Sequence, residues 1–476
     1  MKYSSLTQIQ EAIKSGAESM EQLVQYYLDN AKNNAHLNIY LELYEEELIE
    51  KAKVLDLKIK NQPEELGKLW GMVVSIKDVI CYKEHRVSAS SKILGDFESL
   101  FSATAVERIL AEDALIIGRS NCDEFAMGSS NENSAFGPTL NGIGENRVPG
   151  GSSGGAAVSV QMDTCLAALG TDTGGSVRQP ASFCGVLGMK PSYGRISRHG
   201  LIAYGSSFDQ VGVFGHGIED IAILLEIMSG QDPFDSTSSK KEVPEYSKLL
   251  SPEKHTYKIA YLETAIEHPK IDAEVRQKAY LTLDKLKAQG HEVEGVEFKY
   301  LDYIVPAYYV LTTAEASSNL SRFDGVRYGF RAEGAQSLED TYTLSRTQGF
   351  GSEVKRRIML GTFVLSSGYY DAYYTKAQKI RRLVANETLD LLKEYDFIFL
   401  PTTPAPAWQL GDKSSDPVEM YLADIFTVQA NMVGLPAISF PSGTNSDGLP
   451  IGMQLIGNRF QEDKLLAFVK EYLSTT

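Results

Sequence analysis

Two glycine-rich turns, each containing a serine, constrain this chain more than any other feature. Residues 150–155 read Gly-Gly-Ser-Ser-Gly-Gly, and residues 173–176 read Thr-Gly-Gly-Ser. We name them the Ser152 turn and the Ser176 turn. Because glycine lacks a Cβ, such segments enter backbone conformations closed to other residues and present bare N–H groups to a ligand. A serine that ends such a turn is predicted to lie beside backbone donors that can bind an oxyanion.

A serine hydroxyl is a weak nucleophile until a base accepts its proton, and Lys77 is the candidate base. It ends the run Val-Val-Ser-Ile-Lys, where burial is plausible. Burial disfavours the charged form of a lysine, so its amine can serve as a proton acceptor. The alternative is an ordinary surface lysine without a catalytic role.

The alternation of short apolar runs with amphipathic segments predicts an α/β sheet. The segment 166–170 is a buried-strand candidate that leads directly into the Ser176 turn. Predicted strands cover residues 71–77, 114–118, 166–170, 257–262 and 397–400, with a strand pair over 434–441 and 448–457. Predicted helices cover residues 4–60, with a capping box from Ser19 to Gln22, and residues 105–111, 273–289 and 349–395, followed by a last helix from about residue 461.

Composition narrows the classes of function. The formal net charge of −16 repels phosphate backbones, so the chain is a poor candidate for binding nucleic acid by itself. The four cysteines, Cys81, Cys122, Cys165 and Cys184, lie far apart, which favours reduced, buried thiols over a zinc site or a disulfide framework. The polar N-terminus and the lack of a long apolar run predict a cytoplasmic protein without a membrane anchor.

Three alternative interpretations of the Ser152 turn fit less well. Residues 150–154 match the G-x-S-x-G nucleophile elbow, but that elbow needs a strand directly before it, and residues 141–149 are loop-like. None of the seven histidines lies in the last third of the chain, where such a hydrolase would place its own. A flexible linker is disfavoured by the core-like residues 156–160, and a phosphate loop by the missing Gly-Lys-Ser/Thr ending.

Taken in order, Lys77, the Ser152 turn and Gly-Thr-Asp-Thr-Gly-Gly-Ser-Val-Arg-Gln-Pro-Ala at 170–181 resemble the amidase signature family. The likeness continues through residues 185–198 and nearly to the C-terminus. Within the family, residues 123–134, 317–327, 353–362 and 366–374 resemble the A subunits of the glutamyl-tRNA(Gln) or aspartyl-tRNA(Asn) amidotransferases. The resemblance implies one α/β domain over residues 1–476, with a mixed sheet flanked by helices on both faces and a helical region, 1–60, packed on its core.

The resemblance also assigns roles to individual residues. It implies that Ser176 is the acylating nucleophile, that Ser152 is a bridging serine preceded by a cis peptide, and that Lys77 is the base. The oxyanion hole is expected from the backbone N–H groups of the Ser176 turn, at Thr173, Gly174, Gly175 and Ser176. For the substrate glutamine it implies Arg357 at the α-carboxylate, Asp424 at the α-amino group and Tyr308 in the pocket wall, with Arg356 as the neighbouring alternative to Arg357.

The implied function is that of a glutaminase which supplies ammonia for amidation of Glu-tRNA(Gln), Asp-tRNA(Asn) or both. We expect no cofactor and no metal in this chain. The resemblance implies that ATP and magnesium are used by a partner, the B subunit, which also holds the charged tRNA, and that a small C subunit completes a heterotrimer. Two alternatives remain open: a free-standing amidase for another carboxamide, and a non-catalytic assembly protein. Intact Lys77, Ser152 and Ser176 argue against the second.

Overall fold

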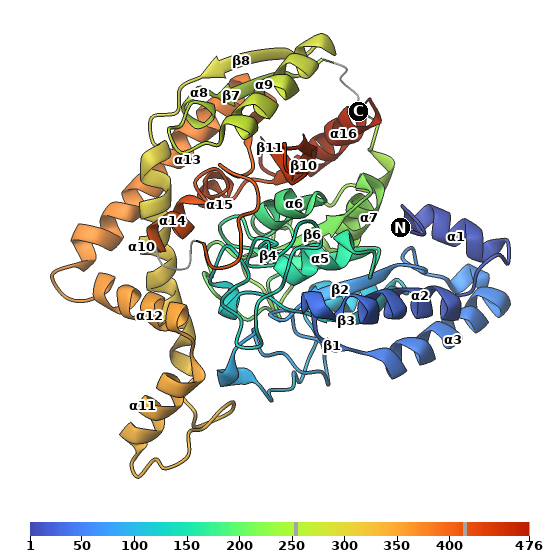
Figure 1. Ribbon diagram of the computed structural model, residues 1–476, viewed down its shortest axis with the longest axis horizontal. Helices are drawn as coiled ribbons and strands as arrows, with labels where there is room; N and C mark the ends of the chain where they lie inside the picture. Colours follow the sequence, from blue (N-terminus) through green and yellow to red (C-terminus); the bar gives the residue numbers. More distant parts are fainter. Residues whose placement is uncertain (252–255, 413–416, 476) are drawn as a thin grey trace.

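A mixed sheet of eleven strands runs through the computed structural model, which describes residues 1–251, 256–412 and 417–475 (Figure 1). The strand order is β1-β3-β2-β4-β6-β5-β10-β11-β9-β7-β8. The strands are β1 (Tyr40–Leu43), β2 (Val73–Lys77), β3 (Leu115–Ser120), β4 (Ala167–Asp172), β5 (Leu187–Lys190), β6 (Gln210–Gly215), β7 (Lys258–Leu262), β8 (Glu292–Val296), β9 (Phe397–Pro401), β10 (Ala437–Thr444) and β11 (Pro450–Gly457).

Helices flank the sheet on both faces, and further helices lie beyond it on one side (Figure 1). The segment α10 to α13 forms the long helical flank at the left of the view, with α11 at its lower end. The helices are α1 (Leu6–Lys14), α2 (Met20–Asn33), α3 (Glu45–Asn61), α4 (Thr104–Ala111), α5 (Gly154–Gln161), α6 (Arg178–Cys184), α7 (Ile218–Met228), α8 (Glu263–Ile266), α9 (Ala273–Ala288), α10 (Leu301–Asn319), α11 (Leu338–Gly349), α12 (Ser352–Val364), α13 (Lys376–Glu394), α14 (Pro417–Leu422), α15 (Val428–Val433) and α16 (Glu462–Ser474).

Strand pairing brings the chemistry-bearing segments to one place. β2 and β4 are parallel neighbours, with Val74 opposite Ala167 and Ile76 opposite Leu169. The carboxyl ends of parallel neighbours meet at the same edge of a sheet. Lys77, the last residue of β2, therefore lies beside the end of β4, from which the Ser176 turn continues.

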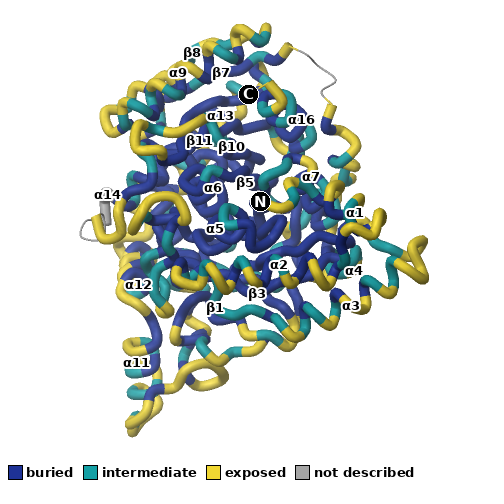
Figure 2. The backbone as a smooth tube through the Cα atoms, turned by 45° about the vertical axis from the view of Figure 1, so that its right-hand side comes forward, coloured by how far each residue is buried: buried dark blue, intermediate teal, exposed yellow. Residues whose placement is uncertain are grey.

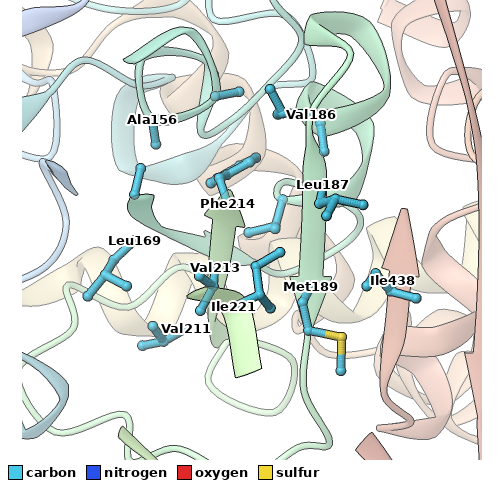
Figure 3. Close-up of a cluster of buried hydrophobic side chains, with 14 of the residues drawn as sticks. Ala156, Leu169, Val186, Leu187, Met189, Val211, Val213, Phe214, Ile221 and Ile438 are labelled. Atoms are coloured by element: carbon cyan, nitrogen blue, oxygen red, sulfur yellow. The ribbon is translucent and has the colours of Figure 1, made fainter. Parts of the chain in front are cut away.

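The core lies at the middle of the sheet, where the strands are buried along their whole length. All residues of β4 and β6 are buried, which requires cover on both faces. Leu169 of β4, Val213 of β6 and Met189 of β5 pack together in this cluster (Figure 3). Figure 2 shows the buried backbone at the centre and the exposed backbone on the outer helices.

The predicted strands are present with shifted ends, and the predicted capping box at Ser19 and Gln22 is confirmed. The predicted helices are also present, but the helical segment 349–395 is divided into α12 and α13 by a turn at residues 365–369. The prediction of helix throughout residues 4–60 is wrong in one place, because β1 interrupts it between α2 and α3. β1 is a short edge strand paired antiparallel with β3, and its Tyr-Leu-Glu-Leu sequence is too short to show a period. The α/β class and the mixed sheet are confirmed, while the assignment of residues 1–476 to one domain stays a prediction.

All four cysteines are free and buried, as predicted. In the described part of the chain no helix combines the length and the apolar character that a membrane crossing requires.

Candidate active site

Lys77 is completely buried at the end of β2 and donates to three hydroxyl groups. Its Nζ lies 2.7 Å from Ser152 Oγ, 2.9 Å from Ser153 Oγ and 2.9 Å from Thr171 Oγ1. Burial lowers the pKa of Lys77 to about 8. At this pKa about a tenth of the lysine is neutral at pH 7, so a basic amine is available beside Ser152. The alternative of a surface lysine is excluded.

The Ser152 turn wraps around this amine and then begins α5. The peptide bond between Gly151 and Ser152 is cis, as the resemblance implied. The Ser152 carbonyl accepts a hydrogen bond from the Asp123 N–H at 3.0 Å. No strand precedes the turn in residues 141–149, so the nucleophile-elbow alternative lacks its structural context.

The Ser176 turn is held by a buried ion pair that the sequence analysis did not single out. Arg178 Nε and Nη2 each lie 3.1 Å from an oxygen of the Asp172 carboxylate, and both side chains are fully buried. Burial alone would raise the pKa of Asp172, but the Arg178 guanidinium outweighs it and lowers this pKa to about 2. The carboxylate also accepts the backbone N–H groups of Gly175 at 2.9 Å and Val177 at 3.2 Å, so it shapes the turn around Ser176.

These bonds decide which backbone donors remain for an oxyanion. The Gly175 N–H is occupied by Asp172, whereas the N–H groups of Thr173, Gly174 and Ser176 donate to no described residue. Ser176 is 8% exposed, and its hydroxyl makes no hydrogen bond within the described residues. A free hydroxyl beside free N–H donors is the arrangement that attack on a carbonyl carbon requires.

Arg357 is buried on α12, whereas Arg356 points outward. The exposed fraction of the side chain is 3% for Arg357 and 49% for Arg356. Arg357 Nε lies 2.8 Å from Glu353 Oε1, and its Nη1 donates to the Tyr204 hydroxyl at 2.8 Å. Its Nη2 donates to no described residue. The guanidinium therefore keeps a free donor edge, and the choice left open by the sequence falls on Arg357.

Asp424 is buried and similarly keeps one free atom. Its Oδ2 accepts hydrogen bonds from the Ser129 hydroxyl at 2.8 Å and the Tyr309 hydroxyl at 3.1 Å. Its Oδ1 accepts none from the described residues. Burial raises the pKa of the Asp424 carboxyl to about 7, and hydrogen bonds from Ser129 and Tyr309 limit this rise.

Contacts through two tyrosines and Thr427 join these charged groups to the Ser176 turn. Tyr309 lies between them, with its hydroxyl on Asp424 and its ring centroid 5.2 Å from the Arg357 guanidinium. Tyr308 packs so closely on Gly174 that a Cβ there would lie 2.4 Å from its hydroxyl. Thr427, whose N–H donates to the Asp424 carbonyl at 3.0 Å, donates its hydroxyl to the Gly174 carbonyl at 2.6 Å.

The structure thus brings together the site residues expected from the sequence, with one correction: the Gly175 N–H, expected in the oxyanion hole, is bound to the Asp172 carboxylate. The sequence analysis missed several that contact them, namely Ser129, Ser153, Thr171, Asp172, Arg178, Tyr204, Tyr309 and Glu353. The pair Asp172 and Arg178 had a signal, because two charged residues flank a run of small residues in 170–178. For Tyr309 the sequence offered no signal other than its position next to Tyr308. Within the described residues, no group of three or more His, Cys, Asp or Glu side chains is arranged to hold a metal ion.

Comparison with known proteins places this geometry in a family. The family model described as "Amidase" matches residues 22–466. The glutamyl-tRNA(Gln) amidotransferase A subunit of Chlorobium chlorochromatii is 49% identical over 473 residues, with 99% of each chain covered, and that of Chlorobium luteolum is 48% identical over 474 residues, with 99% and 97% covered.

Solved structures share the fold at lower identity. The glutamyl-tRNA(Gln) amidotransferase A subunit of Thermotoga maritima is 40% identical, with a TM-score of 0.78 and 96% of this chain and 92% of that chain covered. The peptide amidase of Stenotrophomonas maltophilia is 26% identical, with a TM-score of 0.82 and 100% and 97% covered. The same fold thus carries different amide substrates, so the substrate has to be argued from the site.

Proposed function

This chain belongs to the amidase family, and from that premise we propose that it is the glutamine-hydrolysing component of a tRNA-dependent amidotransferase. In this proposal Ser176 Oγ attacks the side-chain amide carbon of glutamine, the carbon–nitrogen bond breaks, and ammonia leaves. A water molecule then attacks the acyl-enzyme and releases glutamate. The net reaction converts glutamine and water into glutamate and ammonia.

The proton path runs through Ser152 to Lys77. Neutral Lys77 accepts a proton from Ser152 Oγ, which takes one from Ser176 Oγ as the new bond forms. The same protons return to the leaving nitrogen in the reverse order. The free N–H groups of Thr173, Gly174 and Ser176 stabilise the negative charge on the carbonyl oxygen.

Two atoms without a hydrogen-bond partner among the described residues, Arg357 Nη2 and Asp424 Oδ1, are the observation that favours glutamine as the substrate. A free amino acid presents a carboxylate and an ammonium on one carbon, and the site offers a free guanidinium Nη2 and a free carboxylate Oδ1 on either side of Tyr309. The bound ammonium favours the ionised form of Asp424, which compensates for the pKa that burial raises. Tyr308, packed on Gly174, forms the wall between this region and the Ser176 turn.

The similar proteins are named as A subunits, which supports a multi-component assembly. We propose that B and C subunits complete it, that charged tRNA is held by the B subunit, and that ATP and magnesium act there on the carboxylate to be amidated. The net charge of −16 of this chain agrees with tRNA being held elsewhere in the assembly. Glu-tRNA(Gln) is the substrate that the names of the similar proteins support, with Asp-tRNA(Asn) as the second candidate.

A free-standing amidase remains the alternative, since a peptide amidase shares the fold. The two proposals differ in their need for a zwitterion and for partners. The test measures glutamate and ammonia formed from glutamine by the purified chain, alone and with the B and C subunits, with Ser176→Ala as control. We expect hydrolysis that Ser176→Ala abolishes, while amidation of Glu-tRNA by the complex with added ammonium salt stays nearly intact.

Two results would contradict the proposal. Turnover of simple amides without any turnover of glutamine, with or without partners, would favour the free-standing amidase. An equal loss of glutamine-dependent and ammonia-dependent amidation in Ser176→Ala would show that this chain serves assembly rather than glutamine hydrolysis.

A further inference from the structure

Asp209 is a buried carboxylate that lies between the Ser176 turn and the segment that holds Arg357. It directly precedes β6, and the antiparallel register of β4 and β6 sets Asp172 opposite Gln210. Asp209 therefore lies beside Thr173, the first residue of the Ser176 turn. The exposed fraction of Asp209 is 5%, and it forms no ion pair with any described residue.

The first set of bonds ties Asp209 to the Ser176 turn. Thr173 Oγ1 donates to Asp209 Oδ1 at 2.6 Å. The Thr173 N–H is one of the three free donors assigned above to the oxyanion. The bond to the Thr173 side chain restrains the rotamer and the Cα of Thr173, and with them the position of the adjoining N–H.

The second set of bonds ties Asp209 to the support of Arg357. Asp209 Oδ2 accepts the backbone N–H groups of Tyr204 at 3.0 Å and Gly205 at 3.1 Å. The Tyr204 hydroxyl accepts the bond from Arg357 Nη1 and itself donates to Thr312 Oγ1 at 3.0 Å. The turn at Gly205 also packs on Thr173, since a Cβ on Gly205 would lie 3.4 Å from Thr173 Cγ2.

We propose that Asp209 is a positioning residue. It holds the oxyanion donor at Thr173 and the substrate-binding Arg357 in fixed positions relative to each other. The inference rests on the proposed function and deepens it. Asp209 contacts neither the scissile amide nor the zwitterion; it acts through Thr173 on the first and through Tyr204 on the second. The backbone N–H groups of Tyr204 and Gly205 can only donate, and the Gly205 N–H contacts both carboxylate oxygens, at 3.2 Å and 3.1 Å. The NH₂ of an amide at this position would therefore face an N–H donor in either orientation.

The two sets of bonds make different kinetic predictions. Thr173→Val removes only the first and should lower kcat about ten- to a hundredfold for both glutamine and a simple uncharged amide. Tyr204→Phe removes the hydroxyl that binds Arg357 and Thr312, and it leaves the bonds of Asp209 in place. It should raise KM for glutamine about tenfold, while the uncharged amide is unaffected. Asp209→Asn should show both changes at once.

Asp220→Asn is the matched control. Asp220 is also buried, accepts the Leu6 N–H at 2.9 Å, and lies on α7 outside the site. It should leave kcat and KM for both substrates within about twofold of the wild type, whatever its effect on Tm. All measurements use the chain assembled with its partners.

Normal kinetics in a folded Asp209→Asn would overturn the inference and leave the proposed function standing. So would a finding that Thr173→Val and Tyr204→Phe change the same constant by the same factor for both substrates, which a general loss of structure predicts. Should Asp209→Asn not fold, the split between these two variants decides alone. Wild-type enzyme that hydrolyses only the uncharged amide would instead overturn the proposed function, and the inference with it.

Discussion

Lys77 Nζ lies 2.7 Å from Ser152 Oγ, although the two residues are 75 positions apart in the chain. β2 delivers the lysine and the turn before α5 delivers the serine, and both are completely buried. The lowered pKa of Lys77 follows from that burial rather than from any neighbouring cation. The basicity of the site is thus a property of the packing around β2.

Lys77→Arg should be nearly as damaging to glutamine hydrolysis as Lys77→Ala. A guanidinium stays protonated at any working pH and cannot accept a proton from Ser152. The measurement is kcat for glutamine in both variants, with Tm recorded to confirm folding. Substantial activity in folded Lys77→Arg would exclude a proton-accepting role for this position.

The pH dependence should differ between substrates. Lys77 is active when neutral and Asp424 when ionised, so both active forms are gained as pH rises, through pKa values of about 8 and about 7. Below both values, log kcat/KM for glutamine should rise with pH with a slope near two, and for an uncharged amide with a slope near one. Asp424→Asn should reduce the glutamine slope to one. Equal slopes for the two substrates in the wild type would show that Asp424 does not bind the ammonium.

Arg357→Ala should reduce the stabilisation of the glutamine transition state by about 2–5 kcal/mol, which lowers kcat/KM for glutamine by tens to thousands of fold. The loss is expected because the α-carboxylate of bound glutamine would be buried without the guanidinium that pairs with it. An uncharged amide lacks this carboxylate and should be affected far less. Arg356→Ala is the control, because the Arg356 side chain lies next to Arg357 in the sequence and is 49% exposed. If both substrates fell equally in Arg357→Ala, the residue would support the scaffold rather than recognise glutamine.

Asp172→Ala should destabilise the fold as well as the site. It leaves the fully buried Arg178 without its carboxylate partner, and breaking such a pair costs about 3–5 kcal/mol. Chemical denaturation measures the loss directly. Lys393→Ala is the control, because its ion pair with Asp390 is exposed and should contribute less than about 1 kcal/mol. A loss for Asp172→Ala no larger than that of this control would show that the buried pair does not hold the turn.

The sequence by itself determined the residue types of the reaction centre and the local structure that carries them. Lys77 at the end of an apolar run, and two turns that require glycine, specify a strand and two tight loops from local physics alone. Gly175, for instance, has a φ of +132°, a conformation that other residues rarely adopt. The location of β1 could not be predicted in this way, because a four-residue edge strand has neither the length nor the period that identifies a strand. The strand order could not be predicted either, because it depends on pairing between distant segments.

Only the tertiary structure decided between Arg356 and Arg357. Adjacent residues on a helix point about 100° apart, so Arg356 and Arg357 face different directions, but α12 has no strong apolar stripe that identifies the buried face. The packing of α12 against α10 buries Arg357 beside Tyr309 and leaves Arg356 in solvent. The same holds for Asp424, because burial raises the pKa of its carboxyl and its Oδ2 is bound by Ser129 and Tyr309, residues 295 and 115 positions away. Contacts over such separations arise from the global packing of the chain, which no local pattern records.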